Sequence, residues 1–209
     1  MKKLFAFDLK FNWKLVVATI TTTLLLMVDY YHPLTASSAM DRFILYLIIP
    51  LLIILLVFRE NPAEYGFRLG DWKAGLALTA IVIAFAVPIL WVTAKGDPAM
   101  QKYYVRLLEE KGSRLPEYIF LDLIGWEFIF RGWLLFGYAK KYGHDALWLQ
   151  SMPFALAHIG KPEVETLSTI FGGFLFGLVA WRTKSFIYPF LIHYFIFLFT
   201  VLVVGGVIG

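Results

Sequence analysis

A glutamate and an arginine lie in the middle of one strongly apolar run, residues 118–139. Glu127 and Arg131 are four residues apart, so a helix would place them on one face with the carboxylate first, the favourable order for an ion pair. A charge inside a lipid bilayer is costly unless it has a partner, and such residues usually face a bundle interior or a wet cavity and mark a function. The simpler alternative is a structural ion pair that only fixes the rotation of its helix.

Two histidines, His158 and His193, lie in later apolar runs. Taken singly, each is more often a packing residue whose ring is hydrogen-bonded to a backbone carbonyl. Together with Glu127 they supply a general base and a second group that can carry a proton, and Arg131 adds a donor for a developing oxyanion. This set of side chains favours hydrolysis.

A metal is the weaker version of the same hypothesis. Glu127, His158 and His193 could bind zinc and leave a fourth position open, as catalytic sites with two histidines and a glutamate do. However, Arg131 competes for the carboxylate, and the His-x-x-x-His spacing of helical zinc proteases is missing from these segments. The favoured interpretation therefore requires no cofactor.

The composition identifies the class of protein that must position these residues. Of the 209 residues, 60% are hydrophobic and only 16% are charged, and the mean hydropathy is +0.72, which indicates a polytopic membrane protein rather than a soluble domain. The net charge of +4 does not indicate nucleic-acid binding, because the basic residues lie in short loops beside apolar runs. The chain has no cysteine, which excludes a disulfide framework and a thiolate metal site.

The apolar runs predict an all-α transmembrane helical bundle. We treat residues 1–209 as a single transmembrane domain with a catalytic-like core at about 117–205, and we expect an amphipathic interfacial helix within residues 95–115, ended by Gly112 and followed by a span whose first turn holds Pro116. About seven runs approach the length needed to cross a core of about 30 Å: 13–31, 42–58, 74–94, 117–138, 145–160, 166–182 and 185–205.

The loop charges predict the orientation of the bundle. Counting alternate loops, more lysine and arginine residues fall on the side of the N-terminus, where Lys2 and Lys3 contribute, so the N-terminus is placed in the cytosol. The first run is longer than the core of a typical secretory signal and starts after a polar segment, so it is expected to remain as an uncleaved span.

Three motifs in this order resemble the CAAX protease and bacteriocin-processing (CPBP) family of intramembrane endopeptidases, the group related to the Rce1-type prenyl-protein protease. The matches are Glu127 with Arg131, Phe154 with His158, and then His193. The resemblance implies a membrane-embedded peptidase in a multi-pass plasma-membrane protein, with a peptide or protein substrate at or in the bilayer. On this interpretation Glu127 activates water with His158, Arg131 holds the glutamate ionised, and His193 steadies the oxyanion.

Two positions depart from the family pattern. The first glutamate of the family's Glu-Glu motif falls on Trp126 in this chain, and the last family position, usually an asparagine, falls on Phe197. Trp126 cannot accept a proton and Phe197 cannot donate one. These departures leave open a second hypothesis, a catalytically degenerate member that acts as a membrane binding or immunity protein. A small transporter is a third, less favoured because the chain shows no pair of matched halves.

Residues near these motifs carry further expectations. Gly172, Gly173 and Gly177 are expected to let neighbouring helices approach closely, since the last two have the spacing of small-residue packing motifs. Asp122 is expected to lie away from Glu127 and to meet water near the membrane surface. Glu165 is expected to be a solvated loop carboxylate.

Overall fold

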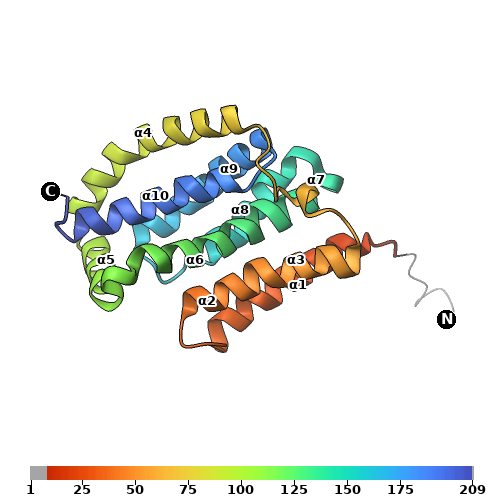
Figure 1. Ribbon diagram of the computed structural model, residues 1–209, viewed down its shortest axis with the longest axis horizontal. Helices are drawn as coiled ribbons and strands as arrows, with labels where there is room; N and C mark the ends of the chain where they lie inside the picture. The colour runs from red at the N-terminus through yellow and green to blue at the C-terminus, as the bar shows by residue number, and fades with distance from the viewer. Residues whose placement is uncertain (1–8, 209) are drawn as a thin grey trace, which may run out of the picture.

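The computed structural model describes residues 9–208, and every regular element among them is helical. Lys2 and Lys3, which contribute to the predicted orientation, lie outside these residues. The elements pack side by side as a bundle (Figure 1). They are α1 (Trp13–Tyr31), α2 (Ser38–Arg42), η1 (Phe43–Ile48), α3 (Ile49–Leu52), η2 (Ile53–Phe58), η3 (Pro62–Tyr65), α4 (Trp72–Gly96), α5 (Pro98–Lys111), η4 (Gly112–Arg114), α6 (Leu115–Glu127), η5 (Phe128–Leu134), α7 (Leu135–Tyr142), η6 (Gly143–Asp145), α8 (Ala146–Leu156), α9 (Glu163–Thr183) and α10 (Ile187–Val204).

Five helices are long and apolar enough to cross a membrane, and the chain is a multi-pass membrane protein by this criterion. Each coincides with a run expected from the sequence, with its ends shifted by a few residues. The expected all-α bundle is therefore confirmed. The five candidate spans are Trp13–Tyr31, Ser38–Phe58, Trp72–Gly96, Glu163–Thr183 and Ile187–Val204.

The expected number of about seven spans is not confirmed. The run 117–138 lies in the continuous helical stretch α6–η5–α7, but it carries Asp122, Glu127 and Arg131 near its middle. The run 145–160 forms only α8, which has 11 residues and is about 16 Å long, roughly half the thickness of a bilayer core. This helix ends early because residues 157–162 form a turn.

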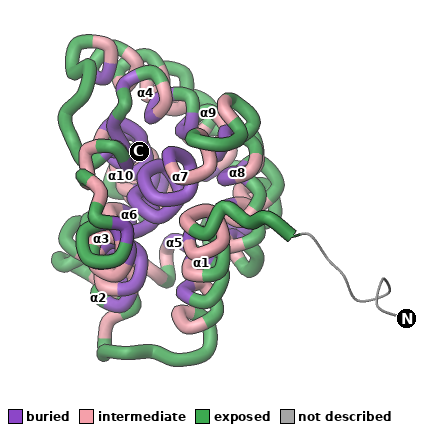
Figure 2. The backbone as a smooth tube through the Cα atoms, turned by 90° about the vertical axis from the view of Figure 1, so that its right-hand side faces the viewer, coloured by how far each residue is buried: buried purple, intermediate pink, exposed green. Residues whose placement is uncertain are grey.

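The stretch α6–η5–α7 is the centre of the bundle. Every residue of η5 is buried, and the tube in Figure 2 shows buried residues concentrated along these elements while α4 is mostly exposed. The π-helical turn η5 begins directly after Glu127 and contains Arg131. Such turns are rare and are found frequently at functional sites.

Helix α5 confirms the expected amphipathic helix between α4 and α6. Asp97 caps its first turn by accepting a hydrogen bond from the Ala99 amide at 2.7 Å, and Gly112 ends it with a positive φ of 51°. Pro116 lies in the first turn of α6, as expected. Met100 and Tyr104 are buried along one face of α5, so this helix closes one end of the bundle rather than only lying beside it.

The loops at the opposite end are joined by ion pairs. Glu60 binds Lys14 at 2.7 Å and Lys140 at 3.0 Å, and Asp71 binds Arg182 at 2.8 Å. These contacts bring together the loops that the sequence assigns to the side of the N-terminus. The side of the membrane on which they lie stays a prediction.

Candidate active site

Glu127 is fully buried at the junction of α6 and η5 and has two charged or titratable partners. Its Oε1 lies 2.7 Å from His193 Nδ1, and its Oε2 lies 3.3 Å from Arg131 Nε. The helical spacing accounts for the arginine contact, while the histidine comes from α10. The carboxylate is therefore not confined to a structural pair with its arginine.

Arg131 lies among aromatic rings and is fully buried. Its guanidinium carbon is 3.8 Å from the ring centroid of Phe154 and 5.2 Å from that of Phe176. The ring faces attract the cation where water is excluded. These contacts hold the positive charge beside Glu127.

His193 lies between the buried carboxylate of Glu127 and two cavities. A carboxylate can only accept hydrogen bonds, so Nδ1 of His193 carries the proton in the contact with Glu127. In the neutral ring, Nε2 then holds a lone pair. The imidazole borders two cavities, so a base oriented by a buried carboxylate faces the space where a substrate would lie.

His158 is held in the same tautomer by the backbone. Its Nδ1 lies 2.8 Å from the carbonyl oxygen of Phe154, one helical turn earlier, so Nδ1 donates and Nε2 of the neutral ring is an acceptor. The ring of Phe154 is 4.4 Å from the His158 ring and 6.1 Å from the His193 ring, centroid to centroid. One phenylalanine thus packs against both imidazoles.

Two cavities meet at these histidines. The smaller one has a volume of about 240 Å³ and lies among α4, α5, α9 and α10. The larger one, about 1170 Å³, lies among α1, η1, α5, α6 and the end of α8. Glu127 and Arg131 border neither cavity, whereas four residues border both: His158, Lys161, His193 and Phe197.

The structure thus brings the four expected site residues into one cluster and forms the expected pair of Glu127 and Arg131, but the histidine beside Glu127 is His193 rather than His158. Glu127 contacts His193 and Arg131, and His158 bonds to Phe154. Glu127 was expected to activate water directly, yet it is 0% exposed and reaches the cavities only through His193.

The two departures from the family pattern also lie at the site. The Trp126 ring is 5.3 Å from the His158 ring, and its Nε1 is buried with no hydrogen-bond partner among the described residues. Phe197 lies one turn after His193 on α10, edge-on to Tyr104 at 5.6 Å. Neither aromatic ring can replace the carboxylate or amide that the resemblance would place there.

A family model described as type II CAAX prenyl endopeptidase Rce1-like matches residues 115–199. Residues 115–199 form an Rce1-like domain of the CPBP family. The domain runs from α6 into α10 and holds all four expected site residues, so the resemblance drawn from the motifs is confirmed for this part of the chain. No curated protein and no solved structure matches the chain.

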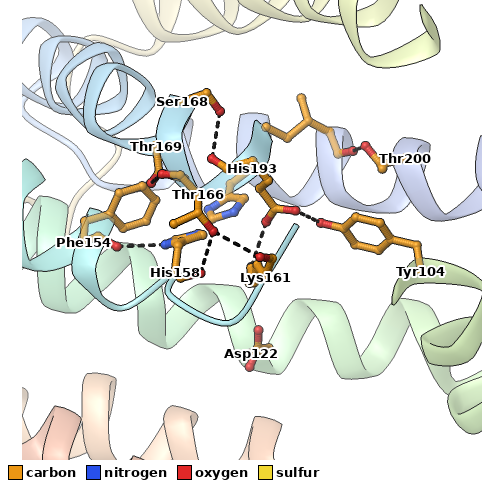
Figure 3. A network of polar contacts seen from close by, with 12 residues as sticks. Tyr104, Asp122, Phe154, His158, Lys161, Thr166, Ser168, Thr169, His193 and Thr200 are labelled. Atoms are coloured by element: carbon orange, nitrogen blue, oxygen red, sulfur yellow. Dashed lines mark hydrogen bonds and ion pairs between the residues drawn. The ribbon is translucent and has the colours of Figure 1, made fainter. Parts of the chain in front are cut away.

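The sequence missed a polar network that joins the Rce1-like domain to α5 (Figure 3). Lys161 Nζ lies 3.1 Å from Glu165 Oε1, and Glu165 Oε2 accepts a hydrogen bond from the hydroxyl of Tyr104. Thr166 fixes the turn after His158 by donating to that residue's carbonyl at 2.9 Å. Glu165 was expected to be solvated, and that prediction is wrong because its side chain is only 18% exposed. The four-residue spacing of Lys161 and Glu165, directly after His158, is the signal that could have revealed the pair.

Asp122 of the Rce1-like domain does not meet water as expected. It is 4% exposed and binds Arg42 at 2.7 Å, and Arg42 also binds Asp29 at 3.1 Å. All three line the larger cavity. A half-buried arginine between two carboxylates therefore ties α1 and α2 to α6.

A zinc-binding arrangement of Glu127, His158 and His193 is not formed among residues 9–208, where no three histidine or acidic side chains converge as a metal site. Nδ1 of His193 is bonded to Glu127, the carboxylate that would have to be a ligand. Nδ1 of His158 is bonded to a carbonyl, which leaves its Nε2 without that contact. The mechanism without a metal stays a prediction.

The glycines of α9 confirm the expected close packing at two of three positions. A Cβ on Gly173 would lie 2.9 Å from the Phe154 ring, and one on Gly177 would lie 2.8 Å from Gln150. Both glycines therefore let α9 lie against α8, which carries Phe154. Gly172 differs, because a Cβ there would meet nothing within 4 Å and the residue borders the smaller cavity.

Proposed function

We propose that the protein is an intramembrane endopeptidase in which a histidine-activated water hydrolyses a peptide bond. The observation that carries the proposal is the position of His193, whose Nδ1 is bonded to buried Glu127 while the ring borders both cavities. A carboxylate behind an imidazole holds its tautomer and stabilises the imidazolium that forms when the ring takes a proton.

The proposed reaction needs only groups at the cavity wall. His193 Nε2 takes a proton from water as the water oxygen bonds to the carbonyl carbon, and a tetrahedral oxyanion forms. The imidazolium then returns that proton to the leaving amine as the carbon–nitrogen bond breaks. His158 accepts a hydrogen bond from the second hydrogen of the water through its own Nε2, which orients the attack.

The substrate we propose is a lipid-modified peptide. The family is described as one of prenyl endopeptidases, and the smaller cavity offers an apolar wall that suits a prenyl group. Ile89, Leu90, Phe176 and Ile196 contribute to that wall. The larger cavity, with its charged and phenolic side chains, would then hold the peptide.

The test is a cleavage assay on the purified full-length protein in lipid nanodiscs, with an internally quenched peptide that carries a farnesylated cysteine near its C-terminus. His193→Ala should lower cleavage to background. His144→Ala is the matched control, because His144 is exposed and packs against Trp181 in a loop away from the cavities, and it should leave the rate unchanged. Equal cleavage by the wild type and His193→Ala would refute the proposal.

A second function is favoured by Trp126 and Phe197. Both line the larger cavity and supply no proton-transfer group, so the chain would bind a peptide there without cutting it, as an immunity or binding protein. In that case the wild type binds the lipopeptide and leaves it intact. Trp126→Glu combined with Phe197→Asn should then create cleavage if only those two groups are missing.

The orientation with a cytosolic N-terminus is part of the proposal and can be tested directly. The chain has no cysteine, so single cysteines report accessibility without background. His144→Cys, in the loop joined to the N-terminal end of α1, should react with an impermeant maleimide only after cells are permeabilised. Arg114→Cys, at the opposite end of α6, should react in intact cells, and the reverse pattern would overturn the orientation.

A further inference from the structure

None of the four expected site residues offers a donor for the oxyanion at the cavity wall. The carbonyl contact of His158 and the carboxylate contact of His193 leave the second ring nitrogen of each neutral imidazole as an acceptor. Arg131 borders neither cavity. Stabilising the negative charge that develops on the carbonyl oxygen is usually the largest single catalytic contribution, so another group has to supply it.

Lys161 is the cation at the wall shared by the two cavities. It lies in the turn between α8 and α9, where its amide donates to the carbonyl of His158 at 3.1 Å. Among the described residues that border the smaller cavity, no other is positively charged. The larger cavity also has Arg42, but that guanidinium is bound by Asp29 and Asp122.

The Lys161 side chain is held in place from two directions. Its Nζ lies 5.5 Å from the ring centroid of Phe197 and 3.1 Å from Glu165 Oε1, and Tyr104 fixes Glu165 in turn. An ammonium has three N–H donors, so the contact with Glu165 uses one of them. Figure 3 shows Lys161 lying beside His158.

We propose that Lys161 is a catalytic residue that binds the oxyanion, with Phe197 as the aromatic platform that positions its ammonium. The proposal rests on the proposed endopeptidase function and adds a residue that neither the motifs nor the family match assigns. Lys161 donates a hydrogen bond and keeps its proton throughout. The electron pair of the carbonyl bond moves to oxygen on attack and returns when the amine leaves.

The first test separates this role from binding. In the nanodisc assay, Lys161→Met should lower kcat by about 10²–10³-fold with little change in KM, as expected for a donor used only in the transition state. Lys161→Arg keeps the charge and should retain part of the rate. Lys111→Met is the matched control, because Lys111 also lies over an aromatic ring, Tyr118 at 4.4 Å, yet it borders neither cavity.

A second measurement does not depend on turnover. A phosphinate version of the lipopeptide, in which a tetrahedral anionic phosphorus replaces the scissile amide, should bind at least tenfold more weakly to Lys161→Met than to the wild type. The uncut amide peptide should bind both alike. Melting temperatures of the variants show whether a loss comes from unfolding, and Phe197→Asn in the Lys161→Met background should recover part of the binding because its amide can donate.

The outcomes distinguish the two proposals. If His193→Ala abolishes cleavage while Lys161→Met keeps both kcat and phosphinate affinity, the role of Lys161 is refuted and the endopeptidase stands. If the wild type cuts nothing but binds the phosphinate in a Lys161-dependent way, the anion site stands and the endopeptidase fails. If the wild type neither cuts the peptide nor binds the phosphinate, both proposals fail.

Discussion

Two glutamates of this chain each hold several partners, in very different surroundings. Glu127 lies at the centre of the bundle with 0% exposure and contacts Arg131 and His193. Glu60 lies in the loop after η2 with its side chain 19% exposed and binds Lys14 and Lys140. Both carboxylates join distant parts of the chain.

The two glutamates differ in whether one of their hydrogen-bond partners can transfer a proton to another group. The partners of Glu60 are two lysines and the Tyr65 hydroxyl. The contacts of Lys140 continue only to a second loop carboxylate, Glu64, at 3.0 Å. One partner of Glu127 is the imidazole of His193, and this ring also borders both cavities. The comparison teaches that a buried carboxylate points to chemistry when one of its partners can pass on a proton, and to structure when none can.

The largest expected effect comes from replacing the two glutamates in parallel. Glu127→Gln should lower kcat by about 10⁴-fold, because an amide does not enforce the tautomer of His193 or stabilise its imidazolium. Glu60→Gln should leave cleavage within about twofold and lower only the melting temperature. Cleavage rates in nanodiscs and thermal unfolding measure both.

A control is needed because Glu127→Gln leaves Arg131 buried without a counter-charge, which costs about 3–5 kcal/mol. The double variant Glu127→Gln with Arg131→Met removes both charges and should recover most of the melting temperature while remaining inactive. If the double variant cleaves at the wild-type rate, Glu127 has only a structural role, as Glu60 does, and the proposed difference between the two glutamates is refuted.

A smaller effect is expected from the packing that supports the central site. Gly173→Ala puts a methyl group 2.9 Å from Phe154, so it should cost about 1–3 kcal/mol and lower cleavage by shifting the carbonyl that holds His158. Gly172→Ala, one residue away, meets nothing within 4 Å and should gain about 0.5–1 kcal/mol as a helical alanine. Equal melting temperatures for the two variants would show that this face of α9 does not hold the site.

The smallest effect is a pH dependence confined to the loop cluster. Partial burial raises the pKa of Glu60, but hydrogen bonds from Lys14, Tyr65 and Lys140 outweigh it and lower the pKa from 4.5 to about 2. A depressed pKa gives stability that is present above the unfolded value and is lost as the pH falls from about 4.5 towards 2. Its size should be about 1 kcal/mol, because the cluster is partly in water.

Melting temperatures between pH 6 and pH 2.5 test this dependence. The wild type should lose more stability over that range than Glu60→Gln, whose side chain does not titrate. Parallel curves for the two proteins would mean that Glu60 contributes no pH-dependent stability.

The sequence predicted the helical class, five of the spans and the helix that became α5, because those depend on local apolar periodicity and on breakers such as Gly112. It also found Glu127, Arg131, His158 and His193, because ionisable residues stand out in apolar runs. It overestimated α8, since the turn that begins at residue 157 depends on Thr166 bonding back to the carbonyl of His158.

The pairing within the site was beyond sequence reasoning. Which of two histidines meets Glu127 depends on how α10 packs on α6, and spacing along the chain does not encode it. The bonds from Tyr104 to Glu165 and from Arg42 to Asp122 span 61 and 80 residues, so they too required the assembled bundle. The orientation in the membrane and the single-domain boundary stay predictions.

The smaller cavity has a consequence for anyone who would work with a trimmed protein. Ile89, Leu90, Met100 and Tyr104 all border it, and all precede residue 115, where the family match begins. A fragment that begins at residue 115 would keep every motif residue. It would lose one side of the smaller cavity and Tyr104, which binds Glu165. Motif integrity alone is therefore a poor guide to where such a membrane protein can be divided.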